Sequence, residues 1–535
     1  MSGSSHIANL SAGEKRALLA QLLRKQAARA EQYFPLSYNQ QGIWFLYQLA
    51  PESAVYNVNF AARITSELNV PALRRALQTL VDRHPSLRTT FPGHFGKPVQ
   101  RIHEHQTLQF TETDGTAWSE AELNSRLIAE AYRPFDLERG PLLRVSLVTR
   151  AAREHILLLV VHHIVIDFWS LAVLLNELGV IYPAECAGVK AALPPLATDY
   201  TDYVRWQAEM LAGPEGERLW AYWKSQLAGP LPILDLPTDR PRPPLPTYRG
   251  ASHDFHLDEA LTARLRALAK DQGATLYTVL LALFQIVLSY HCGQDDLQVG
   301  SPMVGRSRSE FEGIVGLFTN PVILRANLCG NPDFATFLAA ARKTVLGALE
   351  HQDFPTVVLV ERLQPFRDLS RPPLCEVMFV LDKPHRLAEP GAPTYAAHEN
   401  GLRMNPGGLV LESFLLERRA ATLDLVLLVL ETPGSLSASM RYNTDLFDQA
   451  TIARISVHFA TLLRRVVEAP AIRLSALKEL LAKMDRQERA TLHAANRTIN
   501  LQRLQQVKRK VLSASHLGND EGQGMPKYTN ANGRY

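Results

Sequence analysis

Two adjacent histidines followed by an aspartate are the residues of this chain best suited to acid–base chemistry. They are His162, His163 and Asp167, in the stretch VHHIVIDFWS at 161–170. The preceding run HILLLVV at 155–161 predicts a fully buried strand. Neighbouring residues of a strand point to opposite faces, so one histidine can face a cleft while the other is held in the packing. An imidazole suits proton transfer because its unperturbed pKa lies near neutrality.

Three interpretations of this group are open at this point. Paired histidines at a strand end are most often structural. A metal site is the second interpretation, but only three ligands lie nearby and no HExxH pattern accompanies them, so we predict no bound metal. The third interpretation is acyl transfer at a cleft, which requires larger elements to position the histidine.

Strand-like and helical patterns alternate around this group, which predicts a mixture of strands and helices. Ser170 is placed to cap a helix that follows the aspartate. In the second half of the chain, 259–270 and 276–290 carry apolar patterns typical of helices. Seven prolines at 230–246 predict an extended connector, which divides the chain into two large halves.

Composition excludes several classes of function. The 535 residues carry a net charge of +4, which gives no concentrated basic surface for nucleic acid. The four cysteines are far apart and form no CxxC pair, so a disulfide framework or a zinc site is not expected. The most apolar run, 276–288, is shorter than the roughly 20 residues that span a membrane. We therefore predict a soluble cytoplasmic protein without membrane or nucleic-acid partners.

The histidine motif and nine further segments, in order, resemble one enzyme family. HHxxxD followed by xWS is similar to the signature of condensation domains of nonribosomal peptide synthetases, which belong to the chloramphenicol acetyltransferase superfamily. The other segments that match family motifs are LSYNQQGIW at 36–44, RHPSLRTTF at 83–91, YTDYVRWQ at 200–207, LPTDRPRP at 236–243, VGSPMVGR at 299–306, VGLFTNPVILR at 315–325, HQDFP at 351–355, RDLSRPPLCEVMF at 367–379 and YNTDLF at 442–447. The resemblance covers about Tyr33 to Pro470.

The resemblance implies two acetyltransferase-like α/β lobes that form a V-shaped pseudo-dimer around a central tunnel. We expect the following division: an N-terminal helical segment at 1–32 with a helix beginning at Ser11, a first lobe at 33–229, the connector at 230–250, a second lobe at 251–470, and a linker with a disordered tail at 471–535. A carrier protein is expected to dock at each mouth of the tunnel. It would deliver its substrate on a phosphopantetheine arm, so the domain itself would hold no cofactor.

The implied reaction is amide-bond formation between a donor thioester and the amine of an acceptor on a carrier protein. By resemblance His163 faces the amine, as general base or as a group that positions it, while His162 is a structural partner in the catalytic motif. Asp167 is assigned to architecture, with Arg306 as its expected partner and Arg325 as the second choice. Trp169 and Ser170 are expected to support the site.

Four residues are candidates for lining the tunnel. Phe168 stands where the family usually has glycine and would narrow or reshape the donor side. Asn320 is equally suited to capping a turn, and the family pattern favours buried hydrogen-bonding roles for Arg83 and Arg88. The Phe168 variant favours a starter or polyketide-hybrid subtype, in which a fatty-acyl or polyketide donor arrives on a separate carrier or as acyl-coenzyme A.

Other functions stay open beside this expectation. They are an elongation domain with an aminoacyl or peptidyl donor, a freestanding ester-forming enzyme, and a degenerate platform that recruits partners, among which adjacent synthetase modules are expected. A cyclization domain would carry DxxxxD in place of HHxxxD, and neither an EGHGR-like nor a DFGWG segment is present. Cyclization, epimerization and plant-type coenzyme A acyltransfer are therefore disfavoured.

Overall fold

The computed structural model describes residues 32–364, 368, 370–382, 401–432, 434–491, 493 and 497. The chain divides into two compact units, residues 1–472 and 473–535. The helix predicted from Ser11 and the end of the predicted tail lie outside the described residues. Residues 474–491 of the second unit are helical, a feature that the expected linker did not include. Weak apolar periodicity hid this helix.

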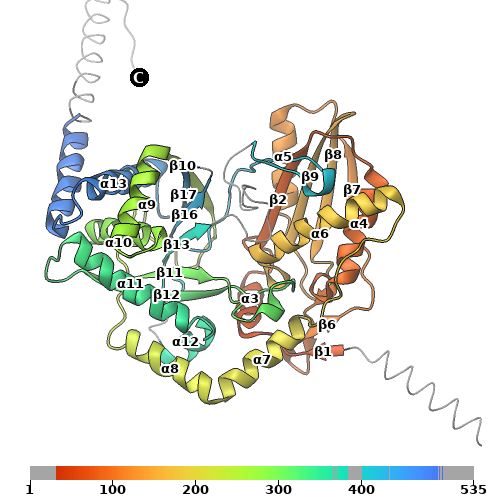
Figure 1. Ribbon diagram of the computed structural model, residues 1–535, viewed down its shortest axis with the longest axis horizontal. Coiled ribbons are helices and arrows are strands. Elements are labelled where there is room, and N and C mark those ends of the chain that lie inside the picture. The colour runs from red at the N-terminus through yellow and green to blue at the C-terminus, as the bar shows by residue number, and fades with distance from the viewer. Residues whose placement is uncertain are drawn as a thin grey trace, which may run out of the picture. The chain divides into compact units, whose positions relative to one another are not determined.

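The first unit contains two six-stranded sheets, each with its own helices (Figure 1). The first sheet has the order β14-β15-β2-β9-β8-β7. Its strands are β2 (Asn57–Ile64), β7 (Gln109–Asp114), β8 (Leu143–Ala151), β9 (Glu154–His162), β14 (Arg403–Met404) and β15 (Leu411–Ser413). Helices α4 (Val70–Arg83), α5 (Glu120–Ala131) and α6 (Phe168–Ala187) contribute to its core. Strand β9 is buried along nearly its whole length, as its continuous apolar run predicts.

The second sheet has the order β10-β17-β16-β13-β11-β12. Its strands are β10 (Gly250–Leu257), β11 (Asp296–Met303), β12 (Asn320–Asn327), β13 (Val377–Asp382), β16 (Leu425–Glu431) and β17 (Leu436–Asn443). The helices that follow in the second half are α9 (Glu259–Asp271), α10 (Leu276–Cys292), α11 (Phe334–Glu350), α12 (Thr356–Leu363) and α13 (Gln449–Glu468). Helix α10 is apolar on all sides because it is almost entirely buried.

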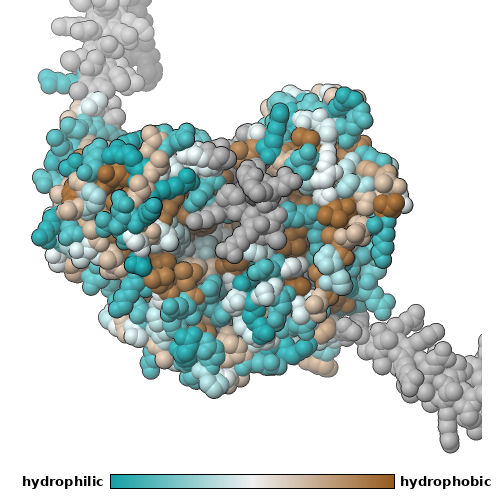
Figure 2. All heavy atoms as spheres, in the orientation of Figure 1, coloured by the Kyte–Doolittle hydropathy of each residue, from teal (hydrophilic) through white to brown (hydrophobic). Residues whose placement is uncertain are grey.

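Short elements complete the first unit. They are β1 (Gln32–Phe34), β3 (Thr89–Thr90), β4 (Gly93–His94), β5 (Lys97–Pro98) and β6 (Gln100–Ile102), helices α3 (Tyr38–Leu49), α7 (Tyr200–Ala212) and α8 (Pro214–Gln226), and the 3-10 turns η1 (Pro85–Arg88), η2 (His163–Val165), η3 (Ser309–Phe311) and η4 (Pro406–Gly408). Residues 231–248 contain no helix or strand, in agreement with the proline-rich connector expected there. In Figure 2 hydrophilic residues predominate on the outer face of both lobes, with apolar patches interspersed.

One segment of the second half does not stay in its predicted lobe. Strand β15 pairs antiparallel with β2 of the first sheet, with Ser413 opposite Ala62, and β14 adds a further edge strand. The expected continuous lobe at 251–470 is therefore interrupted at 403–413. Periodicity did not reveal this crossing because strands of two and three residues are too short to show a pattern.

Among the described residues no single helix is long and apolar enough to cross a membrane. Helices α9 and α10 meet the criterion of length and composition only as a pair, and they are bent by 101° relative to each other.

Candidate active site

The first histidine of the pair is enclosed. His162 is the last residue of β9 and only 4% exposed, and its Nδ1 accepts a hydrogen bond from the backbone N–H of Ile164 at 3.2 Å. Burial lowers the pKa of His162 to about 3, with smaller contributions from His163 and Arg144. The ring is therefore neutral, and it is not among the residues that line the cavity described below. Its position fits a structural role rather than contact with a substrate.

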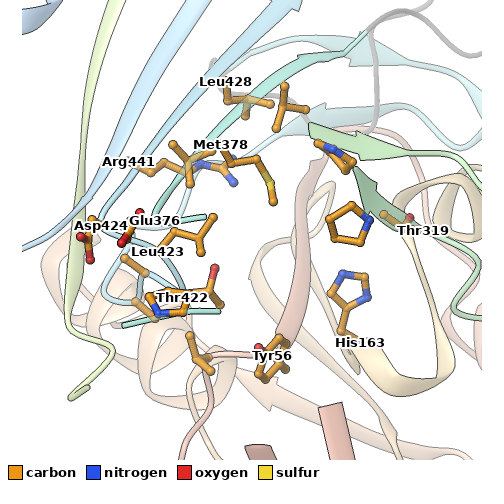
Figure 3. A pocket seen from close by; sticks show the side chains of 18 of the residues that line it. Tyr56, His163, Thr319, Glu376, Met378, Thr422, Leu423, Asp424, Leu428 and Arg441 are labelled. Atoms are coloured by element: carbon orange, nitrogen blue, oxygen red, sulfur yellow. The ribbon is translucent and has the colours of Figure 1, made fainter. Parts of the chain in front are cut away.

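The second histidine borders open space. The backbone N–H of His163 donates to the Tyr56 carbonyl at 2.8 Å, and its ring Nδ1 lies 2.6 Å from the carbonyl oxygen of Ile166. A carbonyl only accepts, so Nδ1 carries a hydrogen, and in the neutral ring Nε2 is the acceptor. Both Tyr56 and His163 line the cavity, and Figure 3 shows their rings at one side of it. The imidazole is therefore oriented with a proton acceptor available.

Asp167 joins the two lobes. It caps the N-terminus of α6 and is fully buried, and its carboxylate accepts from Arg306 Nη1 at 2.7 Å and Nη2 at 3.1 Å. It also accepts the backbone N–H groups of Ser170 at 2.8 Å and Phe318 at 3.1 Å. Burial alone would raise the pKa of Asp167, but Arg306 and the hydrogen bonds from Ser170 hold it below its usual value.

The predicted partner of Asp167 is thus Arg306, and the second choice was wrong. Arg325 lies on β12 and pairs with Asp296 on the neighbouring strand, Nη2 to Oδ2 at 2.7 Å. A cross-strand carboxylate on its own sheet satisfies this guanidinium, which explains why it does not reach Asp167.

Ser170 and Trp169 extend the same junction. The Ser170 hydroxyl accepts from Arg306 Nη2 at 2.8 Å and from the Gly316 N–H at 3.0 Å, and lies 2.7 Å from Asp167 Oδ1. Trp169 Nε1 donates to the Glu312 carbonyl at 2.8 Å, and the Trp169 side chain lines the cavity. Both residues hold the N-terminus of α6 against the loop between β11 and β12.

Of the four tunnel candidates, only Phe168 borders the cavity. It is 48% exposed, and its ring centroid lies 6.4 Å from that of His163 in an edge-to-face arrangement. Its side chain therefore forms part of the wall next to the histidine.

The other three candidates are held in contacts away from the cavity, so their predicted place in the tunnel was wrong. Asn320 Nδ2 donates to the carbonyls of Gln352 and Phe354, each at 2.8 Å. Arg83 pairs with Glu177 at 3.0 Å, and Arg88 donates to a backbone carbonyl. These contacts match the other roles expected for the three residues, hydrogen bonding for Arg83 and Arg88 and capping of a turn for Asn320, whose Oδ1 accepts the Thr356 N–H at 3.1 Å.

The cavity has a volume of about 2900 Å³ and is lined by residues of both lobes. On the second lobe, alternate residues of β13, β16 and β17 face it, among them Met378, Val380, Leu428, Ser439 and Arg441. Figure 3 shows Met378 and Arg441 reaching towards the space opposite His163. Sequence reasoning missed these wall residues, although period-two alternation along each strand would have separated the two faces.

Within the described part of the chain, no three His, Cys, Asp or Glu side chains form a group that could hold a metal ion.

A family model and similar known proteins indicate the same family for this chain. A model of the family "Condensation domain" matches residues 30–488. One protein of the linear gramicidin synthase of Brevibacillus parabrevis is 42% identical over 451 residues, which are 84% of this chain and 6% of that protein. A second protein of the same synthase is 39% identical over 89% of this chain and 9% of its own length. The chain therefore spans less than a tenth of these two relatives.

Solved structures agree in fold. The X-domain from teicoplanin biosynthesis has a TM-score of 0.74 and 28% identity over 83% of this chain and 97% of that one. The first condensation domain of the calcium-dependent antibiotic synthetase, solved with a substrate analogue, has a TM-score of 0.68 and 20% identity, over 83% of this chain and 98% of that one. These neighbours confirm the expected architecture of two acetyltransferase-like lobes.

Proposed function

The chain belongs to the condensation-domain family of nonribosomal peptide synthetases, and from this premise we propose that it joins a donor acyl thioester to the amine of an acceptor aminoacyl thioester. The observation that carries the proposal is the His163 ring. Its Nδ1–H is fixed on the Ile166 carbonyl, and its Nε2 lone pair is available at a cavity lined by both lobes.

The chemistry requires one bond to form and one to break. The acceptor nitrogen attacks the thioester carbonyl, the C–N bond forms, and the C–S bond breaks to release a thiol. The nitrogen loses one proton, which Nε2 of His163 can accept and return to the leaving sulfur. A general base of this kind accelerates a reaction roughly 10²–10⁴-fold. The same nitrogen can also accept a hydrogen bond from the amine and hold it in position, which lowers the barrier further.

Asp167 serves this proposal as a positioning residue. Its carboxylate is occupied by Arg306, Ser170 and the Phe318 N–H. The same ion pair fixes the start of α6, which follows η2 and its histidine. His162 also supports the site, because its buried ring accepts the Ile164 N–H within η2.

The substrates and partners belong to the proposal as well. We propose donor and acceptor carrier proteins that present their substrates on phosphopantetheine arms, with adjacent synthetase modules as further partners and acyl-coenzyme A as an alternative donor. Relatives that are about ten or more times longer support a modular setting. A cavity of about 2900 Å³ is large enough for two elongated ligands. The domain is proposed to need no cofactor of its own.

For the donor, we propose an acyl group without an α-amine, such as a fatty or polyketide chain. The support is Phe168, which presents an apolar ring to the cavity beside His163. An aminoacyl or peptidyl donor is the second candidate, because two similar relatives are proteins of a linear gramicidin synthase.

A recruiting platform without turnover is favoured by one comparison. A teicoplanin X-domain that is 27% identical to this chain has been solved in a complex with OxyB. The position of the His163 ring at the cavity and the intact Asp167–Arg306 pair favour an enzyme instead.

A turnover assay decides among these functions. The full chain would be incubated with a loaded acceptor carrier and equal amounts of acyl-loaded and aminoacyl-loaded donor carriers, and the acceptor would be weighed by intact-protein mass spectrometry. We expect the acyl-transferred mass to dominate. A dominant aminoacyl product would support the elongation domain. An ester product, formed when the acceptor carries a hydroxyl in place of the amine, would support the ester-forming enzyme. Absence of any product would contradict an enzymatic function.

A further inference from the structure

One end of the second sheet presents a row of polar side chains to the cavity. They are Gln298 on β11, Glu376 just before β13, Asp424 just before β16 and Asn443 at the end of β17. The backbone N–H of Asp424 donates to the Glu376 carbonyl at 3.0 Å, and that of Asn443 donates to the Asp424 carbonyl at 3.0 Å. Because Gly300 is opposite Met378 in the parallel pair of β11 and β13, Gln298 lies beside Glu376.

All four side chains are buried although they border the cavity. Their exposures are 3% for Gln298, 7% for Glu376, 4% for Asp424 and 8% for Asn443. Figure 3 shows the Glu376 and Asp424 carboxylates close together, on the opposite side of the space from His163. This row is therefore a part of the cavity distinct from the histidine.

Three members of the row are satisfied by protein groups. Arg242 Nη1 donates to Asp424 at 2.9 Å, and Arg371 Nη1 donates to Glu376 at 3.3 Å. Asn443 Oδ1 accepts the backbone N–H of Asp445 at 2.9 Å. The two guanidiniums next to the row are thus already paired with carboxylates.

Gln298 is the exception. Neither its Nε2 nor its Oε1 has a hydrogen-bond partner among the described residues. A buried carboxamide with both ends unpaired destabilises a fold, so its presence at a ligand cavity calls for a partner that the ligand brings. An apolar chain would leave both atoms unpaired.

The chemistry of that partner follows from the two unpaired atoms. The N–H and C=O of one trans secondary amide point in opposite directions, so a carboxamide is matched by two neighbouring groups of an amide-bearing chain, an N–H for Oε1 and a separate carbonyl for Nε2. We propose that Gln298 binds a secondary amide of a bound substrate in this way, with Oε1 accepting the amide N–H and Nε2 donating to a neighbouring carbonyl. The proposal deepens the function above and rests on it. The amide has two sources, the pantetheine arm that carries a substrate or the backbone of a peptidyl donor.

A second glutamine supplies a matched control. Gln285 on α10 is 2% exposed and its Oε1 also lacks a partner among the described residues, but it does not line the cavity. Replacing either glutamine by leucine removes a buried carboxamide of the same size that has at least one unpaired atom. Only Gln298→Leu is expected to change catalysis.

The test uses the full chain and three donors. They are a dipeptidyl donor on a holo-carrier, an acyl donor without an α-amine on the same carrier, and the propyl thioester of that acyl group, which has no pantetheine amide. We expect Gln298→Leu to lower kcat/KM about tenfold wherever the amide is present, since losing about 1.4 kcal/mol of hydrogen bonding corresponds to that factor. The series is repeated with the acceptor as the varied substrate.

The pattern of loss identifies the source of the amide. Loss with the dipeptidyl donor alone assigns Gln298 to a peptide amide. Loss with both carrier-bound substrates and not with the propyl thioester assigns it to the pantetheine arm. Wild-type kcat/KM with every substrate, an equal loss that includes the propyl thioester, or the same loss in Gln285→Leu would each overturn the proposal.

Two further measurements separate this inference from the proposed function. Calorimetric titration with free pantetheine and with an N-acetyl dipeptide amide measures binding without turnover. We expect Gln298→Leu to bind one of these probes at least tenfold more weakly than the wild type does. A wild-type chain that binds the probe but forms no product contradicts the proposed reaction alone, whereas equal binding by both proteins overturns the inference. Gln298→Met replaces the leucine variant if its melting curve shows misfolding.

Discussion

At the scale of single residues, neighbouring histidines differ because their surroundings differ. His162 closes β9 inside the packing, where burial lowers its pKa to about 3. His163 begins η2 and lines the cavity, while the Ile166 carbonyl accepts a hydrogen bond from its Nδ1. One change of backbone direction between the two residues therefore separates a structural ring from one that can handle a proton.

The buried ring predicts a pH dependence of stability. The folded state binds the His162 proton only near pH 3, while an unfolded histidine binds it near pH 6.5. Between these values the unfolded state carries the extra proton, so stability falls as pH drops, by up to about 1.4 kcal/mol per pH unit. His162→Asn keeps an acceptor for the Ile164 N–H but does not titrate. Urea unfolding between about pH 6 and about pH 4.5 should show a shallower slope for this variant.

The test compares how the free energy of unfolding changes with pH in the wild type and in His162→Asn. An unchanged slope in His162→Asn would mean that the His162 ring takes up its proton in the folded state as readily as in the unfolded chain.

Phe168 carries a prediction about the donor. Phe168→Gly removes an apolar ring from the cavity wall beside His163, which should broaden or shift the preferred length of an acyl donor. Acyl donors of several lengths would compete for one acceptor carrier, with products weighed by mass spectrometry. A clear preference for aminoacyl donors that is unchanged in Phe168→Gly would contradict the starter-type donor.

The sequence predicted contacts correctly for residues that belong to family motifs. The pairing of Asp167 with Arg306 follows from two segments that the family motifs place in order. The tunnel positions of Asn320, Arg83 and Arg88 were wrong because their partners lie in loops or helices whose place in space no spacing reveals. The Asn320 amide, for example, is held by the carbonyls of Gln352 and Phe354.

At the scale of elements, the site depends on the contact between the N-terminus of α6 and the loop at 304–319. The Ser170 hydroxyl accepts the Gly316 N–H and lies 3.0 Å from the Gly316 carbonyl. The Tyr200 hydroxyl of α7 donates to the Leu317 carbonyl at 2.6 Å. The loop is thus clamped from two helices at adjacent residues.

Gly316 has no room for a side chain in this clamp. A Cβ atom there would lie 2.1 Å from Cδ2 of Tyr200, whose buried hydroxyl is already bonded to the loop. Gly316→Ala should therefore destabilise the protein by roughly 1–3 kcal/mol through overpacking. The matched control is Gly313→Ala, because nothing lies within 4 Å of the added atom. Equal urea midpoints for the two variants would contradict this packing.

Elements with strong patterns were predicted, and short ones were not. The runs at 155–161 and 276–290 are β9 and α10, since a long apolar run leaves few alternatives. Strands β14 and β15 have two and three residues, and their pairing with β2 depends on tertiary contacts. One such contact is the close approach of Gly179 on α6 to Pro406 of η4.

At the scale of the first unit, several separate contacts connect the two lobes and the connector between them. Strand β15 extends the first sheet with residues from the second half of the chain. The Asp167–Arg306 pair connects the start of α6 to the loop after β11, with both side chains almost fully buried. The connector residue Arg242 is bonded to Asp424. The shape of the cavity therefore depends on contacts throughout the first unit.

Breaking the buried ion pair should act through stability. Asp167→Ala leaves the Arg306 charge buried without its partner, which costs roughly 3–5 kcal/mol. Asp167→Ala combined with Arg306→Met removes both charges and should recover part of this loss in urea unfolding. A single variant with an unchanged free energy of unfolding but no turnover would instead argue for a direct chemical role of the carboxylate.

The central claim is that the His163 ring handles the amine at the junction of the two lobes. The most direct test is intact-protein mass spectrometry of the acceptor carrier after incubation with a loaded donor carrier and either wild-type protein or His163→Ala. We predict that the variant keeps the wild-type melting curve and forms product at least about 10²-fold more slowly. Product at close to the wild-type rate, from a folded His163→Ala protein, would contradict the account.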